Sequence, residues 1–293
     1  MQAEVIAADN RGVRARYLLR SYVLERISAQ LAEQGSEALL VKGAALALTV
    51  YPMPWLREMT DVDLIVKTER KDQIMTILEQ MGFTRHFVPG RLSYGAFGEV
   101  VFTLPVANQP VMVEVHTRLD KLVGRPVDYQ GIFRRATAAP GLPGLLVPAP
   151  EDHVLLIVLH AAASEFDHTV AFVDLELLFR SGVDAELLVK RARRWRLRTA
   201  LFVALMTLRS LGASSVPERL VEELEAWPLR RRALALYYNL GGFPVARRPL
   251  RLGWPWIIRQ APLRDDLTRW CSGVIGYAGR RSVEKILPQR WAR

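Results

Sequence analysis

The sequence predicts an α+β fold in which a small mixed β-sheet with helices comes first and an all-helical region follows. Up to residue 148, short apolar runs of strand length alternate with segments whose apolar residues recur at helical spacing. Beyond that point nearly every apolar pattern has the helical period, interrupted by glycine, proline or aspartate. The change coincides with Pro148 and Pro150, so we expect two domains, residues 1–148 and 149–293.

The first region is expected to alternate helices and strands. In chain order, we expect a helix over 21–35, a strand over 38–43, a helix over 44–51, a strand over 62–66, a helix over 69–83 and two paired strands over 98–105 and 111–119. Gly35 and Gly82 are suited to end the first and third of these helices, because glycine adopts positive φ at little steric cost. The short connection between the last two strands indicates a hairpin.

The second region is expected to be helical throughout most of its length. The predicted helices cover 151–164, 170–181, 184–196, 198–212, 217–226 and 229–240. The following segment, 243–270, mixes proline, arginine and tryptophan without a clear period. It is either an irregular packed connection or a segment that binds a surface.

Composition limits the classes of protein to which the chain can belong. Its 293 residues carry a formal net charge of +10 and a single cysteine, Cys271. One cysteine excludes an internal disulfide and any cysteine-based zinc site. The first residues lack the apolar core of a signal peptide and no apolar run reaches spanning length, so we expect a soluble cytoplasmic protein. The positive charge fits attraction to nucleic acid, nucleotides or an anionic membrane, or simply solvated helix faces.

A lysine and a glycine stand where the strand over 38–43 leads into a helix. Lys42, Gly43 and Ala44 form this turn. Free backbone N–H groups at the start of a helix stabilise a phosphate, glycine lets the backbone approach it closely, and a lysine adds positive charge. The turn is therefore a candidate phosphate-binding element, although such turns are common.

Carboxylates occur on two of the predicted strands. Asp61 and Asp63 begin the strand over 62–66 and share one face of it, because side chains two residues apart point the same way. Glu114 and His116 share a face of the strand over 111–119. If these strands are neighbours, the three carboxylates suit a hard divalent cation such as Mg²⁺. Otherwise they are ordinary capping and solvent-facing groups.

This ordered set resembles the nucleotidyltransferases of the DNA polymerase beta-like superfamily, and more narrowly a bacterial family of uncharacterised nucleotidyltransferases within it. The resemblance covers roughly residues 15–210. The matching residues are Lys42-Gly43, Tyr51-Pro52, Arg57, Asp61-Val62-Asp63-Leu64 and Glu114-Val115-His116, with His160 and Asp174 in the helical part. The departure is Gly43-Ala44, where the superfamily has a Gly-Ser or Gly-Gly pair, so phosphate contact would fall to the backbone and Lys42.

The resemblance implies a polymerase beta-like core and an enzyme that moves a nucleoside monophosphate from an NTP to a hydroxyl-bearing acceptor, releasing pyrophosphate. It implies that Asp61, Asp63 and Glu114 hold two divalent metal ions, Mg²⁺ or Mn²⁺. It also implies nucleotide contacts from the Lys42 turn and Arg57. His116 would assist the acceptor or orient Glu114.

Other features leave the partners open. His160 and Asp174, on successive predicted helices, would line an acceptor pocket or hydrogen-bond to each other. Nothing selects ATP over other NTPs, and a small metabolite, a sugar or a peptide would serve as acceptor. No nucleic-acid-binding module is recognisable, so tryptophan and arginine late in the chain favour packing over nucleic acid, with membrane contact through 250–270 as an alternative.

Two other functions fit the same motifs. The D-x-D pair could be the metal clamp of a nucleotide-sugar-dependent glycosyltransferase, although about 60 residues precede it and such enzymes have a longer run of βα units. Alternatively, the chain could be a non-catalytic nucleotide-binding relative that keeps the fold without turnover. Turnover of UDP-sugars compared with turnover of NTPs tests the glycosyltransferase alternative. Nucleotide binding without formation of any product identifies the non-catalytic alternative.

Overall fold

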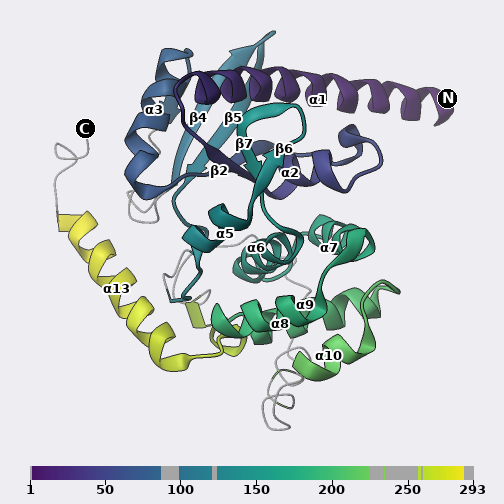
Figure 1. Ribbon diagram of the computed structural model, residues 1–293, viewed down its shortest axis with the longest axis vertical. Coiled ribbons are helices and arrows are strands. Elements are labelled where there is room, and N and C mark those ends of the chain that lie inside the picture. The colour runs from purple at the N-terminus through teal and green to yellow at the C-terminus, as the bar shows by residue number, and fades with distance from the viewer. Residues whose placement is uncertain are drawn as a thin grey trace. The chain divides into compact units, whose positions relative to one another are not determined.

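The computed structural model describes residues 2–86, 99–120, 124–224, 232, 234, 257, 258 and 260–286. The chain divides into two compact units. One comprises Met1–Arg118 and Tyr129–Ala149, and the other comprises Leu119–Asp128 and Pro150–Arg293. The first holds a sheet with helices and the second is helical in its described part (Figure 1), which confirms the expected α+β class.

The first unit is built on a seven-stranded mixed sheet of order β3-β4-β5-β2-β1-β7-β6. Its strands are β1 (Ala38–Val41), β2 (Asp61–Ile65), β3 (Thr84–His86), β4 (Glu99–Val106), β5 (Gln109–His116), β6 (Thr137–Ala139) and β7 (Leu142–Val147). At its centre, β2 pairs in parallel with β5 and antiparallel with β1. The two strands that carry the motif carboxylates are therefore neighbours, as the metal-site prediction requires.

The helices and short helical turns of this unit are α1 (Gln2–Glu33), α2 (Lys42–Thr49), η1 (Pro54–Leu56), η2 (Thr68–Arg70), α3 (Lys71–Gln80) and α5 (Tyr129–Arg135). Each of the seven elements expected in the first region is present. However, α1 begins well before its expected start at residue 21. Residues 11–20 are mostly exposed or half-buried, so this part of the helix has no strong apolar stripe that a periodicity rule could detect.

Three strands were not expected from the sequence. The three residues of β3 are all exposed, and β6 is equally short. Pro143 and Gly144 lie in β7, and both residue types disfavour strands. Nevertheless β7 pairs in parallel with β1 and packs under α1, so tertiary contacts outweigh its local preference.

The two faces of the sheet differ in chemistry. On one face, Leu40, Val62, Leu64 and Val113 join a hydrophobic core with residues of α1 and α3. The carboxylates Asp61, Asp63 and Glu114 occupy the alternate positions of β2 and β5, and so project from the opposite face. The hydrophobic core thus fixes the strands while leaving the other face free to carry polar groups.

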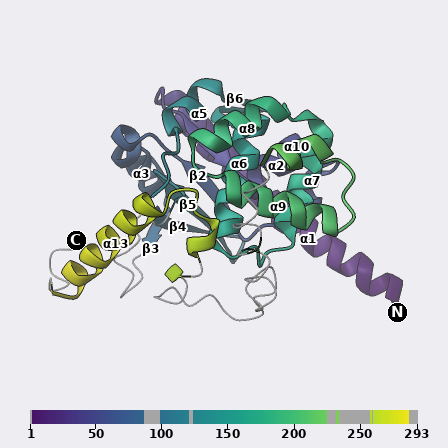
Figure 2. The same ribbon diagram turned by 90° about the horizontal axis from the view of Figure 1, so that it is seen from below.

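The second unit surrounds one buried helix with others. Its described helices are α6 (Pro150–Ala163), α7 (Val170–Gly182), α8 (Ala185–Arg194), α9 (Arg198–Ser210), α10 (Glu218–Leu224) and α13 (Leu267–Ile286), with the short turn η3 (Ala261–Leu263). Almost every residue of α6 is buried, and α7, α8 and α9 pack around it (Figures 1 and 2). The helices predicted from 151 to 226 are confirmed.

Predictions made for the later part of the chain are only partly testable. Only residues 232 and 234 of the helix expected over 229–240 are described, and 243–256, with Trp254 and Trp256, lies outside the described residues. The end of the segment expected to be irregular, from Leu267 onwards, is instead the start of α13. The proposed membrane contact through 250–270 therefore stays a prediction.

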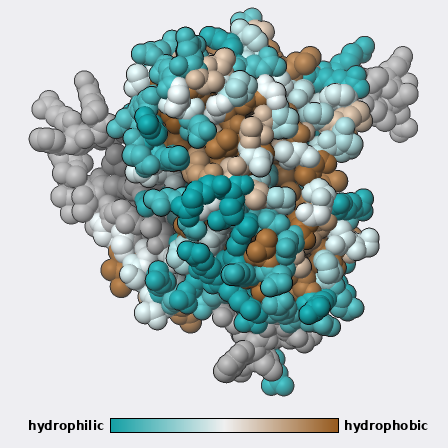
Figure 3. Space-filling view, viewed as in Figure 1, coloured by the Kyte–Doolittle hydropathy of each residue, from teal (hydrophilic) through white to brown (hydrophobic). Residues whose placement is uncertain are grey.

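The basic helix α8 has the solvated face that its charge pattern indicates. The Asp184 carboxylate accepts a hydrogen bond from the Leu187 N–H at 2.9 Å and so caps its N-terminus. Arg193 and Arg194 are exposed, and Figure 3 shows hydrophilic side chains over this helix. Within the described part of the chain, none of the helices combines the length and the apolarity that a membrane span requires.

Gly144 is a point at which the contact between α1 and β7 should be sensitive to substitution. A Cβ there would lie 2.8 Å from the Ala32 nitrogen and 2.9 Å from the Ser28 carbonyl oxygen, at a φ of +83°. We expect Gly144→Ala to lower the free energy of unfolding by about 2–4 kcal/mol, from left-handed strain and overpacking together. Chemical unfolding of parent and variant measures this.

Gly141→Ala is the matched control. Its φ is +70° but nothing lies within 4 Å of the added Cβ, so it carries the backbone strain alone. We expect it to lose about 1 kcal/mol. An equal decrease in the free energy of unfolding for Gly144→Ala and Gly141→Ala would contradict a close approach of α1 to β7.

Candidate active site

The register of β2 and β5 places the carboxylates side by side. Asp63 lies directly opposite Glu114, and Ile65 lies opposite His116. On the other side of β2, Asp63 lies opposite Val41, the last residue of β1. Three strands therefore bring the Lys42 turn, the D-x-D pair and the E-x-H pair to one place on the sheet.

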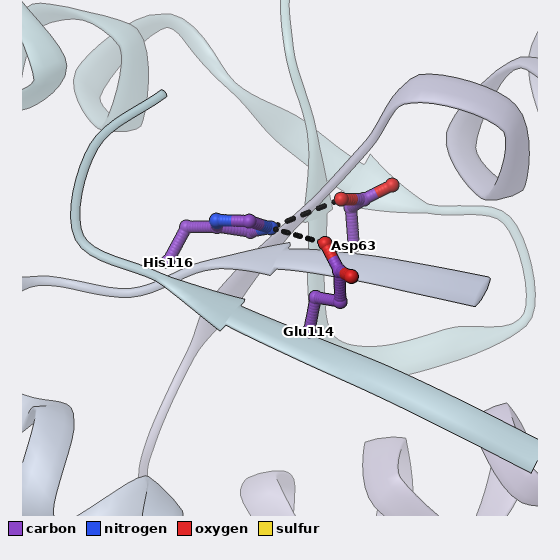
Figure 4. A group of neighbouring side chains, drawn as sticks. All are labelled: Asp63, Glu114 and His116. Carbon is purple, nitrogen blue, oxygen red and sulfur yellow. Dashed lines mark hydrogen bonds and ion pairs between the residues drawn. The ribbon is translucent and has the colours of Figure 1, made fainter. Parts of the chain in front are cut away.

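Asp63, Glu114 and His116 form a compact group of side chains (Figure 4). The His116 Nε2 lies 3.0 Å from the Asp63 Oδ1 and 3.3 Å from the Glu114 Oε2. One ligand atom from each of the three residues lies within 4.8 Å of the others. Asp63 and His116 are buried, and the Glu114 side chain is 20% exposed. Such a group of nitrogen and oxygen donors is able to hold a metal ion.

Lys42 supplies the positive charge beside this group. Its Nζ lies 2.5 Å from the Asp63 Oδ1, and its side chain is 15% exposed. Although burial opposes ionisation of both partners, the ion pair lowers the pKa of Asp63 well below its usual range and raises the pKa of Lys42. The sequence assigned Lys42 to a phosphate. The structure gives it a carboxylate partner, and its φ of +52° is unusual for a residue other than glycine.

Asp61 belongs to the same electrostatic neighbourhood. It is half-buried, and burial together with the charges of Asp63 and Glu114 raises its pKa, while Lys42 opposes the rise. The sequence prediction had Asp61, Asp63 and Glu114 as the metal ligands. Among the described residues, the group close enough to hold a metal ion is Asp63, Glu114 and His116, without Asp61. The metal-binding role of Asp61 stays a prediction.

Gly43 and Arg57 meet at the start of α2. A Cβ on Gly43 would lie 3.2 Å from the Arg57 Cζ, so the guanidinium lies close against this glycine. The Arg57 Nη1 also donates to the Glu58 carbonyl oxygen at 2.5 Å. Ala44, by contrast, is buried in the hydrophobic core. The predicted nucleotide contacts of these residues stay predictions, but Arg57 does lie at the Lys42-Gly43 turn.

The remaining two predicted residues lie in the second unit. His160 is in α6, and its ring stacks on that of His168 with centroids 6.5 Å apart. Asp174 is in α7 and is 2% exposed. These two helices pack against each other. Both alternatives, a mutual hydrogen bond and an acceptor pocket, stay predictions.

Glu99 is a residue of the site that sequence reasoning missed. It is 6% exposed, and the β4–β5 register places it directly opposite His116. Its Oε2 lies 3.9 Å from the His116 Nδ1. The feature of the sequence that could have identified Glu99 is the two-residue hairpin turn at Ala107 and Asn108, both at positive φ. A turn of this length fixes the register of β4 and β5, and this register places Glu99 opposite His116.

The charge balance of the group predicts the effect of removing Lys42. Lys42→Met leaves the buried Asp63 carboxylate beside Glu114 without its ammonium partner. We expect a loss of about 3–5 kcal/mol in the free energy of unfolding measured in EDTA, partly recovered by a divalent cation. Lys190→Met, at an exposed position on α8, should change stability by less than about 0.5 kcal/mol. A tolerated Lys42→Met would contradict the ion pair.

The raised pKa of His116 predicts how the free energy of unfolding depends on pH. Burial opposes its charging, but hydrogen bonds with Asp63 and Glu114 raise its pKa above the ordinary 6.5. Its charged form therefore stabilises the fold fully below pH 6.5, and this contribution is lost as pH rises through the raised pKa. In EDTA, the stability difference between parent and His116→Gln should be larger at about pH 6 than at about pH 9. An unchanged difference would contradict this assignment.

Comparison with known proteins agrees with the geometry. A family model described as an uncharacterised nucleotidyltransferase matches residues 3–212, which include the whole sheet and the helices through α9. Neither the curated proteins nor the solved structures contain a match to the chain. The family supports nucleotidyl transfer as the general activity. The expected resemblance is confirmed: this chain belongs to the family of uncharacterised nucleotidyltransferases.

Proposed function

We propose that the protein transfers a nucleoside monophosphate from an NTP to a hydroxyl-bearing acceptor and releases pyrophosphate. The observation that carries this proposal is the pairing of Asp63 with Glu114 across parallel strands, beside the Lys42-Gly43 turn. The acceptor oxygen forms a bond to the α-phosphorus while the bond to the bridging oxygen of the β-phosphate breaks. This reaction is the same for any nucleobase of the NTP and for any acceptor that carries a hydroxyl group.

The residues present fit a divalent cation. Asp63 and Glu114 offer carboxylate oxygens within 4.8 Å of one another, and Asp61 stands two positions before Asp63 on the same strand. Asp61, Asp63 and Glu114 would hold Mg²⁺ or Mn²⁺, because these ions take one or two carboxylates together with substrate phosphates. When bound, such an ion neutralises the phosphates and lowers the pKa of the acceptor hydroxyl.

The start of α2 is suited to the triphosphate. Val41, at the N-cap position, makes no side-chain cap hydrogen bond, so its side chain leaves the first N–H groups of α2 to other partners. Gly43 lets a phosphate approach the backbone, and the Arg57 guanidinium lies next to it. In this proposal Arg57 moves from Gly43 to the phosphate oxygens, and Lys42 turns from Asp63 towards the negative charge of the phosphates.

Pyrophosphate release tests the proposal. Protein is incubated with Mg²⁺ or Mn²⁺, each of the four NTPs including ATP, and a panel of sugars, small alcohols and peptides. We expect Asp63→Asn and Glu114→Gln each to lower the rate at least about 100-fold, because they remove charge that positions the reacting groups. Asp72→Asn, on the exposed face of α3, should leave the rate unchanged.

Four outcomes are informative. Undiminished turnover by Asp63→Asn would refute the assignment of the site. Tight NTP binding without product over long incubation would favour a non-catalytic relative, and turnover of UDP-sugars instead of NTPs would favour a glycosyltransferase. A higher acceptor KM in His160→Gln or Asp174→Asn, with the KM for NTP unchanged, would support an acceptor role for the second unit.

A further inference from the structure

We infer that Asp63, Glu114 and His116, with Glu99 behind the histidine, form a mixed nitrogen–oxygen site that takes a divalent first-row transition ion such as Mn²⁺ or Co²⁺ in preference to Mg²⁺. The cation's use in catalysis rests on the proposed function, but its binding does not. The inference changes the expected ligand set and narrows the expected metal from Mg²⁺ or Mn²⁺ to a transition ion.

The first observation is where His116 points. Its ring is buried, and its Nε2 faces both carboxylates, at 3.0 Å from Asp63 and 3.3 Å from Glu114 (Figure 4). An ion placed among these oxygens therefore meets an imidazole nitrogen. Mg²⁺ prefers an all-oxygen octahedron, whereas divalent ions of the first transition row bind an imidazole nitrogen more readily than Mg²⁺ does. The ring also pairs with the two carboxylates when no ion is present, but an ion that enters among them meets a nitrogen donor that Mg²⁺ does not favour.

The second observation is what lies behind the ring. Glu99 is opposite His116 in the β4–β5 register, and its Oε2 lies 3.9 Å from the Nδ1, an ion-pair separation longer than a hydrogen bond. A carboxylate that hydrogen-bonds to the far nitrogen of a ligating histidine leaves the near nitrogen to bind metal. In this inference Glu99 moves closer to the Nδ1 when the ion binds and acts as a positioning residue. Its burial at the start of β4, where a carboxylate needs a polar partner, fits this role.

The third observation concerns competition. Lys42 Nζ lies 2.5 Å from the Asp63 Oδ1, which is one of the oxygens that a cation would use. A cation at the group must displace the ammonium or use the second oxygen of Asp63. In either case His116 gains importance as a ligand, because in its neutral form it binds a transition ion without adding to the negative charge that already holds Lys42.

Electron paramagnetic resonance of Mn²⁺ bound to the full chain tests the inference directly. A directly bound imidazole nitrogen produces a ¹⁴N coupling in pulsed spectra of the parent protein, with no variant and no nucleotide present. We expect this coupling. Mn²⁺ bound without any ¹⁴N coupling, or no Mn²⁺ binding at all, would overturn the inference.

Affinity measurements on variants supply the second arm. Because the carboxylates of the site suit both Mn²⁺ and Mg²⁺, the ratio of the two affinities is compared between proteins to isolate the effect of the imidazole. We expect His116→Asn to weaken Mn²⁺ binding at least about 10-fold while changing Mg²⁺ binding little, and Glu99→Gln to weaken Mn²⁺ binding about 10-fold with a reduced ¹⁴N coupling. Glu79→Gln, an exposed position on α3, is the control. If His116→Asn lowered the affinities for Mn²⁺ and Mg²⁺ by the same factor, the inference would be overturned.

The two proposals fail separately. If Mn²⁺ shows the ¹⁴N coupling but no NTP is turned over, the proposed function is wrong and the site stands. If NTPs are turned over and Mn²⁺ shows no ¹⁴N coupling, the mixed site is wrong and the function stands.

Discussion

The site depends on the parallel pairing of β2 with β5. It forces Asp63 and Glu114 into neighbouring positions on one face of the sheet, away from most water. Two carboxylates so placed repel each other and lose their hydration, and both effects destabilise the folded state. The arrangement is tolerable only because Lys42 and His116 lie against the same oxygens. The hydrophobic face beneath, packed against α1 and α3, supplies the stability that this polar face lacks.

The chain topology provides the counter-charges with few residues. Because β1 is antiparallel to β2, the last residue of β1 ends beside Asp63, and Lys42 follows immediately. Because β4 and β5 form a tight hairpin, Glu99 returns to the level of His116. Strand pairing alone therefore assembles five polar side chains from four separate segments. A shift of one residue in any of these registers would turn the corresponding side chain into the hydrophobic core.

The sequence was most informative where local chemistry and global fold agree. The apolar runs around Val62 and Val113 predicted strands, and Gly82 predicted the end of a helix, because these residues have the same preference in isolation as in the fold. The pairing of Asp63 with Glu114 came from a resemblance, since no local rule brings together strands so far apart in the chain. The strand β7 was invisible because Gly144 serves the close approach of α1 and has no strand preference of its own. Likewise, nothing local gives Lys42 its carboxylate partner or Glu99 its histidine, since both depend on register.

The electrostatics of the group favour one divalent cation over other ways of balancing the site. The carboxylates of Asp63, Glu114 and Glu99 lie within 3.9 Å of the His116 ring nitrogens, and the ammonium of Lys42 lies 2.5 Å from Asp63. With His116 neutral, as a nitrogen ligand must be, the carboxylates of this group outnumber its single ammonium, and Asp61 beside them adds another carboxylate. A divalent ion offsets two of these negative charges, whereas a charged His116 offsets one. Binding the ion and neutralising the histidine are therefore coupled, since each carboxylate that turns to the metal releases the ring from the hydrogen bonds that favour its charged form. In the proposed reaction, the triphosphate of the substrate would restore negative charge beside Lys42 and Arg57. Lys42 and Arg57 would then exchange their partners in the free protein for phosphate oxygens when the substrate binds.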